Sequence, residues 1–230
     1  MSRTAPRVEG VVFDLDGTLV DTMPFVIEGL ATVVAPYRRR PTPEEVMNSL
    51  GGPSDVCIRR LLGGTRHLAL ALAAYLEFLR QNDHVAQPFR GARTLLKQLR
   101  AASVRVGLWT GRERNSTVER LRMLAWERCF DPVVCGDDLS SYKPDPEGLL
   151  KIVRSWRLTP AQVIFVGDSH QDLAGGGAAG VPTVFIDNGR TIASELARQP
   201  MAVAPNPPGA YALVRKQVLQ QRVGLRTTRS

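Results

Sequence analysis

The chain has 230 residues, of which 43% are hydrophobic and 23% charged, so it can bury a substantial core and is not an intrinsically disordered protein. The longest apolar run in its middle, residues 68–76, falls far short of the ~20 residues that a membrane-spanning helix needs. The net charge of +8 comes from 30 basic residues, only four of them lysine, spread along the chain without the interleaved aromatics of a nucleic-acid-binding module. We therefore expect a protein that binds small anionic metabolites, and neither nucleic acid nor membrane.

The three cysteines, Cys57, Cys129 and Cys135, form no C-x-x-C pair, so the sequence indicates neither a disulfide framework nor a zinc site. Residues 1–7 contain no apolar segment, and we expect no signal peptide. These features predict a cytoplasmic protein. The composition leaves open whether it is a monomer or a homodimer.

The first predicted strand, near residues 10–14, ends in two aspartates. Asp14 and Asp16 are spaced i, i+2 and are followed directly by Gly17 and Thr18. Residues with this spacing in a strand point to the same face, so the two carboxylates would lie close together. Such a pair is costly unless a cation neutralises it, and Mg²⁺ prefers oxygen ligands. A polar turn is the simpler alternative, but it does not account for both aspartates before a Gly-Thr pair.

About ninety residues separate the first strand from the second, whereas a plain crossover needs about a dozen. Three helices are predicted in this stretch. One begins with a capping box at Thr42 and stops near Gly51, and the others span residues 54–62 and 67–81. We expect residues 20–86 to form a small helical cap domain inserted after the first strand.

Further strands are predicted near residues 104–109, 132–135, 163–167 and 183–186, and capping boxes at Ser116 and Thr159 predict helix starts between them. This alternation predicts an α/β fold, a three-layer Rossmann-like core with a parallel sheet, made of residues 1–19 and 87–204. Residues 205–209 are expected to break structure, and residues 205–230 to hold a C-terminal helix near 210–223 and a basic tail.

Three polar motifs follow the later strands. They are Thr110-Gly111, Lys143-Pro144 and the run from Gly167 to Asp172, which contains Asp168. The carboxyl ends of parallel strands meet at one edge of the sheet, where ligands of such folds bind. In this order, with the Asp14-Leu15-Asp16-Gly17-Thr18 motif, they resemble the haloacid dehalogenase superfamily, and in particular its phosphoglycolate-phosphatase-like group with a helical cap.

The resemblance implies a Mg²⁺-dependent phosphatase that acts on a small phosphorylated metabolite. Asp14 would be the nucleophile that forms an aspartyl-phosphate. Asp16 would be the general acid and then the general base, and its backbone carbonyl would also bind Mg²⁺. Thr110 and Gly111 would bind the phosphate oxygens.

The later motifs complete the implied site. Lys143 would neutralise charge on the phosphate in the transition state. Asp168 would bind Mg²⁺ together with Asp14 and Asp16. Asp172 would hold either a metal-bound water or Lys143.

Substrate choice is expected to lie in the cap and in the loop after the second core strand. Gly51 and Gly52 could face the active site, and Arg59 could bind a second anionic group, although a solvated helix face explains Arg59 equally well. Arg112 and Asn115 are near enough to Thr110 to contact substrate. The histidines, His67, His84 and His170, are expected to be structural or solvent-facing.

Two alternatives to a phosphatase remain. A sugar-phosphate mutase of the same superfamily is close, but such enzymes tend to carry an arginine soon after a cap glycine, and here none follows Gly51 until Arg59. A catalytically inactive binding protein is the second, although every catalytic position is filled. A dehalogenase is disfavoured by Asp16, because a halide leaving group needs no proton. Phosphonate cleavage is disfavoured because residues 20–86 contain no lysine.

Overall fold

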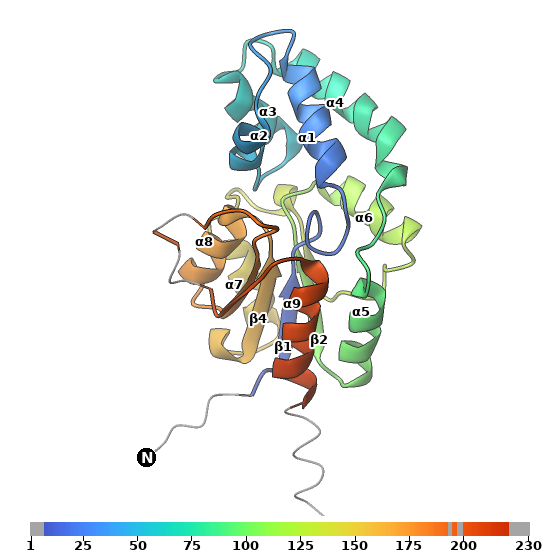
Figure 1. Ribbon diagram of the computed structural model, residues 1–230, viewed down its shortest axis with the longest axis vertical. Helices are drawn as coiled ribbons and strands as arrows, with labels where there is room; N and C mark the ends of the chain where they lie inside the picture. The colour runs from blue at the N-terminus through green and yellow to red at the C-terminus, as the bar shows by residue number, and fades with distance from the viewer. Residues whose placement is uncertain (1–6, 193–194, 197–199, 221–230) are drawn as a thin grey trace, which may run out of the picture.

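Six parallel strands form one sheet in the order β3-β2-β1-β4-β5-β6, in a computed structural model that describes residues 7–192, 195–196 and 200–220. The strands are β1 (Gly10–Phe13), β2 (Arg105–Trp109), β3 (Val133–Val134), β4 (Val163–Gly167), β5 (Thr183–Ile186) and β6 (Ala202–Ala204). The fully buried β1 lies in the middle, between β2 and β4 (Figure 1). The predicted parallel sheet is thereby confirmed.

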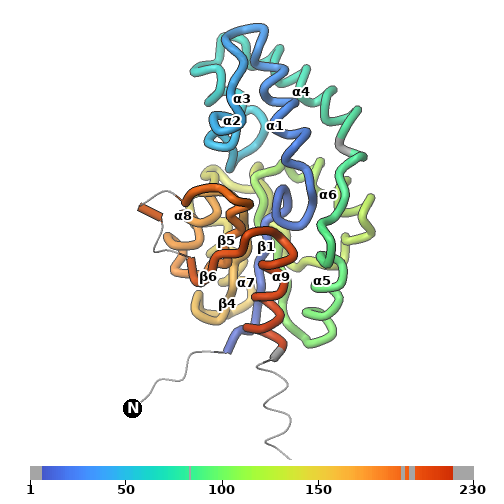
Figure 2. Tube along the Cα trace, viewed as in Figure 1, coloured from blue at the N-terminus to red at the C-terminus, as the bar shows by residue number. Residues whose placement is uncertain are grey.

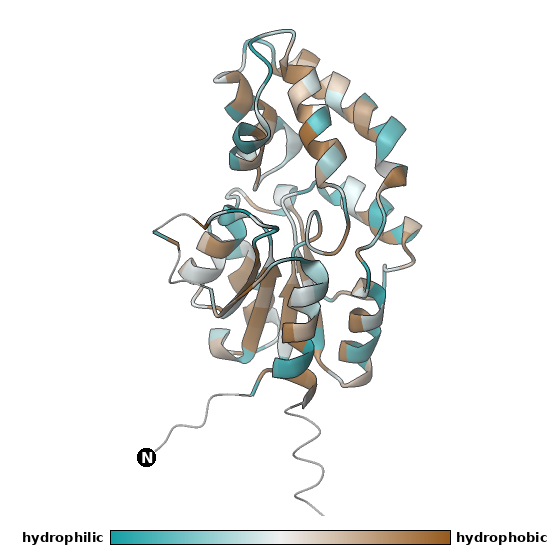
Figure 3. Cartoon of the chain, in the orientation of Figure 1, coloured by the Kyte–Doolittle hydropathy of each residue, from teal (hydrophilic) through white to brown (hydrophobic). Residues whose placement is uncertain are grey.

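Helices cover both faces of this sheet. They are α5 (Ala92–Ala101), α6 (Arg114–Met123), α7 (Glu147–Ser155), α8 (His170–Ala178) and α9 (Pro207–Val214). Alternate residues of β1 point to opposite faces, so that Val11 and Phe13 pack in the cluster that includes α5 and α9, whereas Val12 packs with α7. The strands form the hydrophobic middle layer of the three-layer core (Figure 3).

Four helices lie between β1 and β2 in the chain. They are α1 (Met23–Val34), α2 (Pro43–Ser49), α3 (Ser54–Leu62) and α4 (Leu68–Asn82). They pack on one another through a hydrophobic cluster of their own, which includes Val34, Ile58 and Tyr75. The predicted capping box of Thr42 starts α2, and the helix predicted over residues 54–62 is α3, which ends at Gly63 in a left-handed conformation. In Figure 2 these helices lie together above the sheet, apart from the helices that flank it.

Several local predictions were wrong. β6 was missed because its three residues are too few to form a pattern. Helix α6 begins at Arg114, and the Ser116 hydroxyl donates to the Glu113 carbonyl instead of capping. The box at Thr159 starts only a single 3₁₀ turn.

The expected break at residues 205–209 is in fact the start of α9. The Asn206 side chain accepts a hydrogen bond from Gly209 N at 2.9 Å, and prolines occupy the first helical positions, where a missing N–H costs nothing. After α9 the described chain continues as a short π-helix, Arg215–Gln220. The predicted basic tail, residues 226–230, lies outside the described residues.

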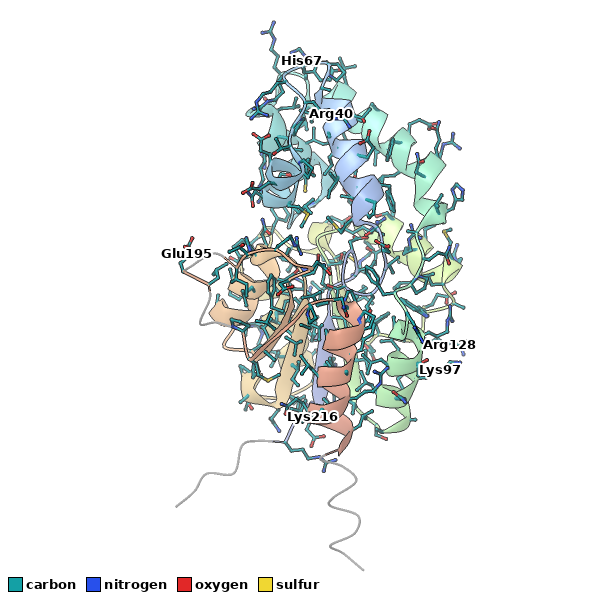
Figure 4. All side chains as sticks on the ribbon, in the orientation of Figure 1. Arg40, His67, Lys97, Arg128, Glu195 and Lys216 are labelled. Atoms are coloured by element: carbon teal, nitrogen blue, oxygen red, sulfur yellow. The ribbon has the colours of Figure 1, made fainter. Side chains whose placement is uncertain are left out.

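Charged side chains are dispersed over the surface. Figure 4 shows Arg40 at one end of the molecule, Lys216 at the other, and both Arg128 and Lys97 on a third side. In the described part of the chain, no helix combines the length and the apolar character needed to cross a bilayer.

Candidate active site

The polar motifs meet at the carboxyl edge of the sheet, as predicted. Asp14 directly follows β1, and its backbone N–H donates to Val166 of β4 at 2.9 Å, which fixes the start of the loop. Thr110 follows β2 and Asp168 follows β4. A cavity of about 100 Å³ lies between this edge and helices α1–α4, and Asp14, Asp16, Thr110 and Asp168 line it.

Lys143 is the centre of the polar network. Its Nζ lies 2.7 Å from Oδ1 of Asp14, 2.6 Å from Oδ1 of Asp172 and 2.8 Å from the carbonyl oxygen of Trp109. The ammonium group also lies 4.7 Å from the centre of the Trp109 ring. Burial alone would lower the pKa of Lys143, but Asp14 and Asp172 raise it above its ordinary value, so the lysine is charged.

Three buried carboxylates converge beside this lysine. One carboxylate oxygen from each of Asp14, Asp168 and Asp172 lies within 4.8 Å of the others. Burial and the neighbouring carboxylates raise the pKa of Asp14 well above its ordinary value, despite Lys143. Burial and Asp172 likewise raise the pKa of Asp168 to about 7, although Arg190 opposes the shift. Concentrated negative charge and oxygen donors are what a hard divalent cation requires, so these residues fit a metal site.

Two side chains hold Asp168 in place. The hydroxyl of Thr18 donates to its Oδ1 at 3.2 Å, and the guanidinium of Arg190 lies 3.3 Å from its Oδ2. Arg190 also donates to the backbone carbonyl of Asp168. The sequence analysis did not single out Arg190, because it lies beyond β5, outside the recognised motifs.

Asp172 occupies the third position of α8 and forms a capping box with Ser169. Its Oδ2 accepts from the backbone N–H of Ser169 at 3.0 Å and from the Ser169 hydroxyl at 2.6 Å. Its other oxygen, Oδ1, accepts a hydrogen bond from Lys143 Nζ. Of the two partners predicted for Asp172, the structure thus brings it to the lysine.

Asp16 forms an ion pair with Arg112, which sequence reasoning had considered only as a substrate contact. Nη2 of Arg112 lies 2.9 Å from Oδ1 of Asp16, and Nε lies 3.1 Å from Oδ2. Although burial alone would raise the pKa of Asp16, the guanidinium beside it lowers that pKa below its ordinary value.

The loop after β2 packs tightly against the loop between α2 and α3. A Cβ placed on Gly111 would lie 3.0 Å from the backbone carbon of Gly51 and 3.2 Å from the backbone nitrogen of Gly52. Gly51 has a φ of +108°, which disfavours other residues. Gly51 and Gly52 therefore lie against the sheet edge, and both line the cavity.

Some predicted residues do not reach the cavity. Arg59 is exposed on α3 and Asn115 is exposed near the start of α6, and neither is among the lining residues. A helix that buries the face formed by Cys57, Ile58 and Leu61 turns Arg59 to solvent, so a contact between Arg59 and a bound substrate is not supported.

The histidines also lie outside the cavity. His67 stacks on Tyr37 at the far end of the helices α1–α4 (Figure 4), and His170 stacks on Phe185 of β5. His84 is exposed.

The wall formed by α1 and α4 was missed by the sequence analysis. Met23, Val26 and Leu30 of α1 and Tyr75 and Leu79 of α4 line the cavity. Their spacings of three and four residues are those of one helix face, so periodicity could have indicated them, but it could not say which face meets the site.

Glu113 was missed as well. It precedes α6 and lines the cavity, and its Oε1 accepts a hydrogen bond from the backbone N–H of Ser54, the first residue of α3, at 2.6 Å. A second bond comes from α8, where the Gln171 side chain donates to the Asn48 carbonyl of α2 at 3.1 Å. These two bonds join the sheet edge to helices α2 and α3.

Comparisons with known proteins agree with this geometry. The sequence profile of the haloacid dehalogenase-like hydrolases matches residues 11–186. Phosphoglycolate phosphatase 1 of Pseudomonas aeruginosa is 32% identical over 203 residues, which cover 83% of this chain and 74% of that protein. Pyrophosphatase PpaX of Halalkalibacterium halodurans is 27% identical over 182 residues, 78% of this chain and 84% of that protein.

Solved structures share the fold. A predicted phosphoglycolate phosphatase from Haemophilus somnus matches with a TM-score of 0.77 at 19% identity, covering 93% of this chain and 100% of its own. The family profile extends from β1 through β5, so it includes every polar motif of the site. The chain belongs to the haloacid dehalogenase-like hydrolases.

Proposed function

We propose that this hydrolase is a Mg²⁺-dependent phosphatase that cleaves a small phosphomonoester through an aspartyl-phosphate on Asp14. The observation that carries the proposal is the position of Asp14, which is buried at the sheet edge beside the Lys143 ammonium and two further carboxylates. Relatives named phosphoglycolate phosphatase support a phosphomonoester as substrate.

In the first half-reaction, a carboxylate oxygen of Asp14 attacks phosphorus in line with the ester oxygen. The new oxygen–phosphorus bond forms as the bond to the alcohol breaks, and Asp16, which must enter this step in its protonated form, gives its proton to the departing oxygen. In the second half-reaction, a water oxygen attacks the same phosphorus and gives a proton to Asp16. The bond to Asp14 then breaks, which releases inorganic phosphate and restores both aspartates.

Charge on the transferring phosphoryl group needs fixed partners. Lys143 is buried, charged and held by three acceptors, so little reorganisation is needed when negative charge builds up nearby. The Thr110 hydroxyl and the Gly111 N–H are proposed to donate to phosphate oxygens. Asp172 is proposed to act indirectly, by keeping Lys143 directed at Asp14.

Asp14, Asp168 and the backbone carbonyl of Asp16 are proposed to hold Mg²⁺. When bound, the cation would neutralise charge shared between Asp14 and the phosphate. The raised pKa values of Asp14 and Asp168 support this assignment, because they report carboxylates that lack sufficient positive charge around them.

Residues 20–86, which contain α1–α4, are proposed to act as a cap that closes over the substrate. Gly51 and Gly52 would seal the site, and the hydrogen bond between Glu113 and Ser54 would hold the closed arrangement. The apolar face of α1 and α4 would exclude water from the reacting phosphate, although one water must be admitted for the second half-reaction.

The test is phosphate release from a panel of phosphorylated metabolites, with Mg²⁺ and with EDTA, by the wild type and by Asp14→Asn. Release that requires Mg²⁺ and disappears in the variant is expected. Isomerisation of a sugar phosphate without phosphate release would identify a mutase instead. Wild-type rates in Asp14→Asn would rule out the aspartyl-phosphate route.

A further inference from the structure

The ion pair between Arg112 and Asp16 restrains the proposed proton donor. Both carboxylate oxygens are engaged, at 2.9 Å by Nη2 and at 3.1 Å by Nε. The Arg112 side chain is only 6% exposed. A forked pair of this kind fixes the plane of the carboxylate as well as its position. Asp16 therefore cannot turn an oxygen toward a leaving group without giving up one of these bonds.

Besides Lys143, Arg112 is the residue of the cavity wall that can pair with a second negative charge on the substrate. Of the described residues that line it, only Lys143 and Arg112 carry cationic side chains. Lys143 lies at the phosphate end, between Asp14 and Asp172. The wall of α1 and α4 is largely apolar, and Glu113 would repel an anion.

We propose that Arg112 selects phosphomonoesters whose alcohol half carries a carboxylate close to the ester oxygen, and that this carboxylate replaces Asp16 on the guanidinium. The inference rests on the proposed function. In the structure the Asp16 carboxylate lies on the guanidinium, and in this proposal a substrate carboxylate takes the same place. The substrate thereby releases Asp16 to face the leaving oxygen, and Arg112 keeps a forked partner throughout.

The exchange explains why a neutral ester would be a poor substrate. A carboxylated ester replaces one ion pair with another, so releasing Asp16 costs little. A neutral ester offers no replacement, and the guanidinium would be left buried without its carboxylate. The small cavity, about 100 Å³, also requires a short alcohol half, which keeps the substrate's carboxylate near Arg112.

The test compares 2-phosphoglycolate with its neutral amide, which has nearly the same size, in the presence of Mg²⁺. We expect kcat/KM of the wild type to favour the carboxylated ester by roughly 100-fold or more. Arg112→Met should reduce this preference to within a few-fold, because its kcat/KM on the carboxylated ester falls. Arg112→Lys keeps the charge but not the fork, and should retain only part of the preference.

Arg114→Met is the matched control. Arg114 is two residues further on and pairs with Asp138, outside the cavity, so its replacement should leave the preference intact. Thermal unfolding establishes that each variant is folded. Equal kcat/KM on the two esters in the wild type, or a full preference in folded Arg112→Met, would overturn the inference.

A binding measurement separates this inference from the proposed function. Calorimetric titration of 2-phosphoglycolate and of its amide needs no turnover. If no ester of the metabolite panel is hydrolysed, the proposed function fails. Tighter binding of the carboxylated ester by the wild type, lost in Arg112→Met, would still support the role of Arg112. Equal binding of both esters by the wild type would contradict it.

Discussion

Lys143 and Asp172 form a buried ion pair with an Nζ–Oδ1 distance of 2.6 Å, although 29 positions separate them in the chain. Both side chains are at most 3% exposed. The other oxygen of Asp172 is fixed by Ser169 at the start of α8, so the helix itself determines where the carboxylate points. The lysine is thereby directed at Asp14, and a residue that need not touch the substrate sets the geometry of the proposed nucleophile.

Asp172→Asn should lower kcat by about 10- to 100-fold, as is usual for residues that orient a catalytic group. An asparagine oxygen can still accept from Ser169, so α8 should form normally, but the charge that holds Lys143 is lost. Phosphate release measures the effect. Asp145→Asn is the control, since Asp145 is exposed and accepts only a local bond from Glu147 N. Unchanged kcat in Asp172→Asn would show that Lys143 needs no such support.

Asp14→Asn should abolish turnover, because an amide cannot act as the attacking carboxylate. The variant should remain folded, since an uncharged side chain avoids the cost of burying a charge and relieves repulsion from Asp172 and Asp168, while the amide oxygen can still accept from Lys143. Phosphate release and thermal unfolding measure the two effects. Asp21→Asn provides a matched change at an exposed carboxylate of the same segment and should keep wild-type activity.

Asp16→Asn should slow both half-reactions for ordinary esters, since the same group donates and then accepts the proton. Acetyl phosphate distinguishes the two half-reactions, because acetate leaves without a proton and the first half-reaction then needs no general acid. We expect this variant to release about one acetate per active site rapidly and then to stall as the aspartyl-phosphate. Rapid continuous turnover of acetyl phosphate by Asp16→Asn would mean that another group activates water.

The polar motifs were predictable from sequence because each follows a strand, and parallel strands bring their carboxyl ends to one edge. Asp14, Thr110, Lys143 and Asp168 are near one another for that reason. The cavity wall of α1 and α4 was not predictable, because helical periodicity identifies an apolar face without saying what it meets. The pairing of Arg112 with Asp16 depends on side-chain packing between two loops, for which the sequence carries no periodic signal.

Gly136 lies against the loop that follows β2, and the close packing there leaves no room for a side chain. It begins the 3₁₀ turn after β3, its N–H donates to the Arg112 carbonyl at 2.9 Å, and a Cβ there would overlap the carbonyl oxygen of Gly111. Gly136→Ala should therefore displace the proposed phosphate-binding loop and raise KM by about 10-fold or more, since small misplacements at an active site are costly. Gly64→Ala is the control, because a Cβ at Gly64 meets nothing within 4 Å. Equal KM values for the two variants would contradict this account.

The metal-free protein should become less stable as pH rises toward neutrality. Burial and Asp172 raise the pKa of Asp168 to about 7 from an ordinary value of 3.8, so between these pH values the folded protein keeps a proton that the unfolded chain has lost. The free energy of unfolding therefore decreases with rising pH across this window. The raised pKa of Asp14 acts in the same direction.

Thermal unfolding in EDTA and in Mg²⁺ between pH 5 and pH 8 measures this effect. In EDTA the wild type should lose Tm relative to Asp168→Asn as pH rises, since the variant has no carboxyl to ionise at that position. Mg²⁺ should restore Tm most strongly at pH 8, where the carboxylates are ionised and ready to bind it, and should do little for the variant. A difference in Tm between the two proteins that stays constant with pH in EDTA would contradict this account. It would mean that other groups of the protein already neutralise the buried carboxylates, so that they need no cation.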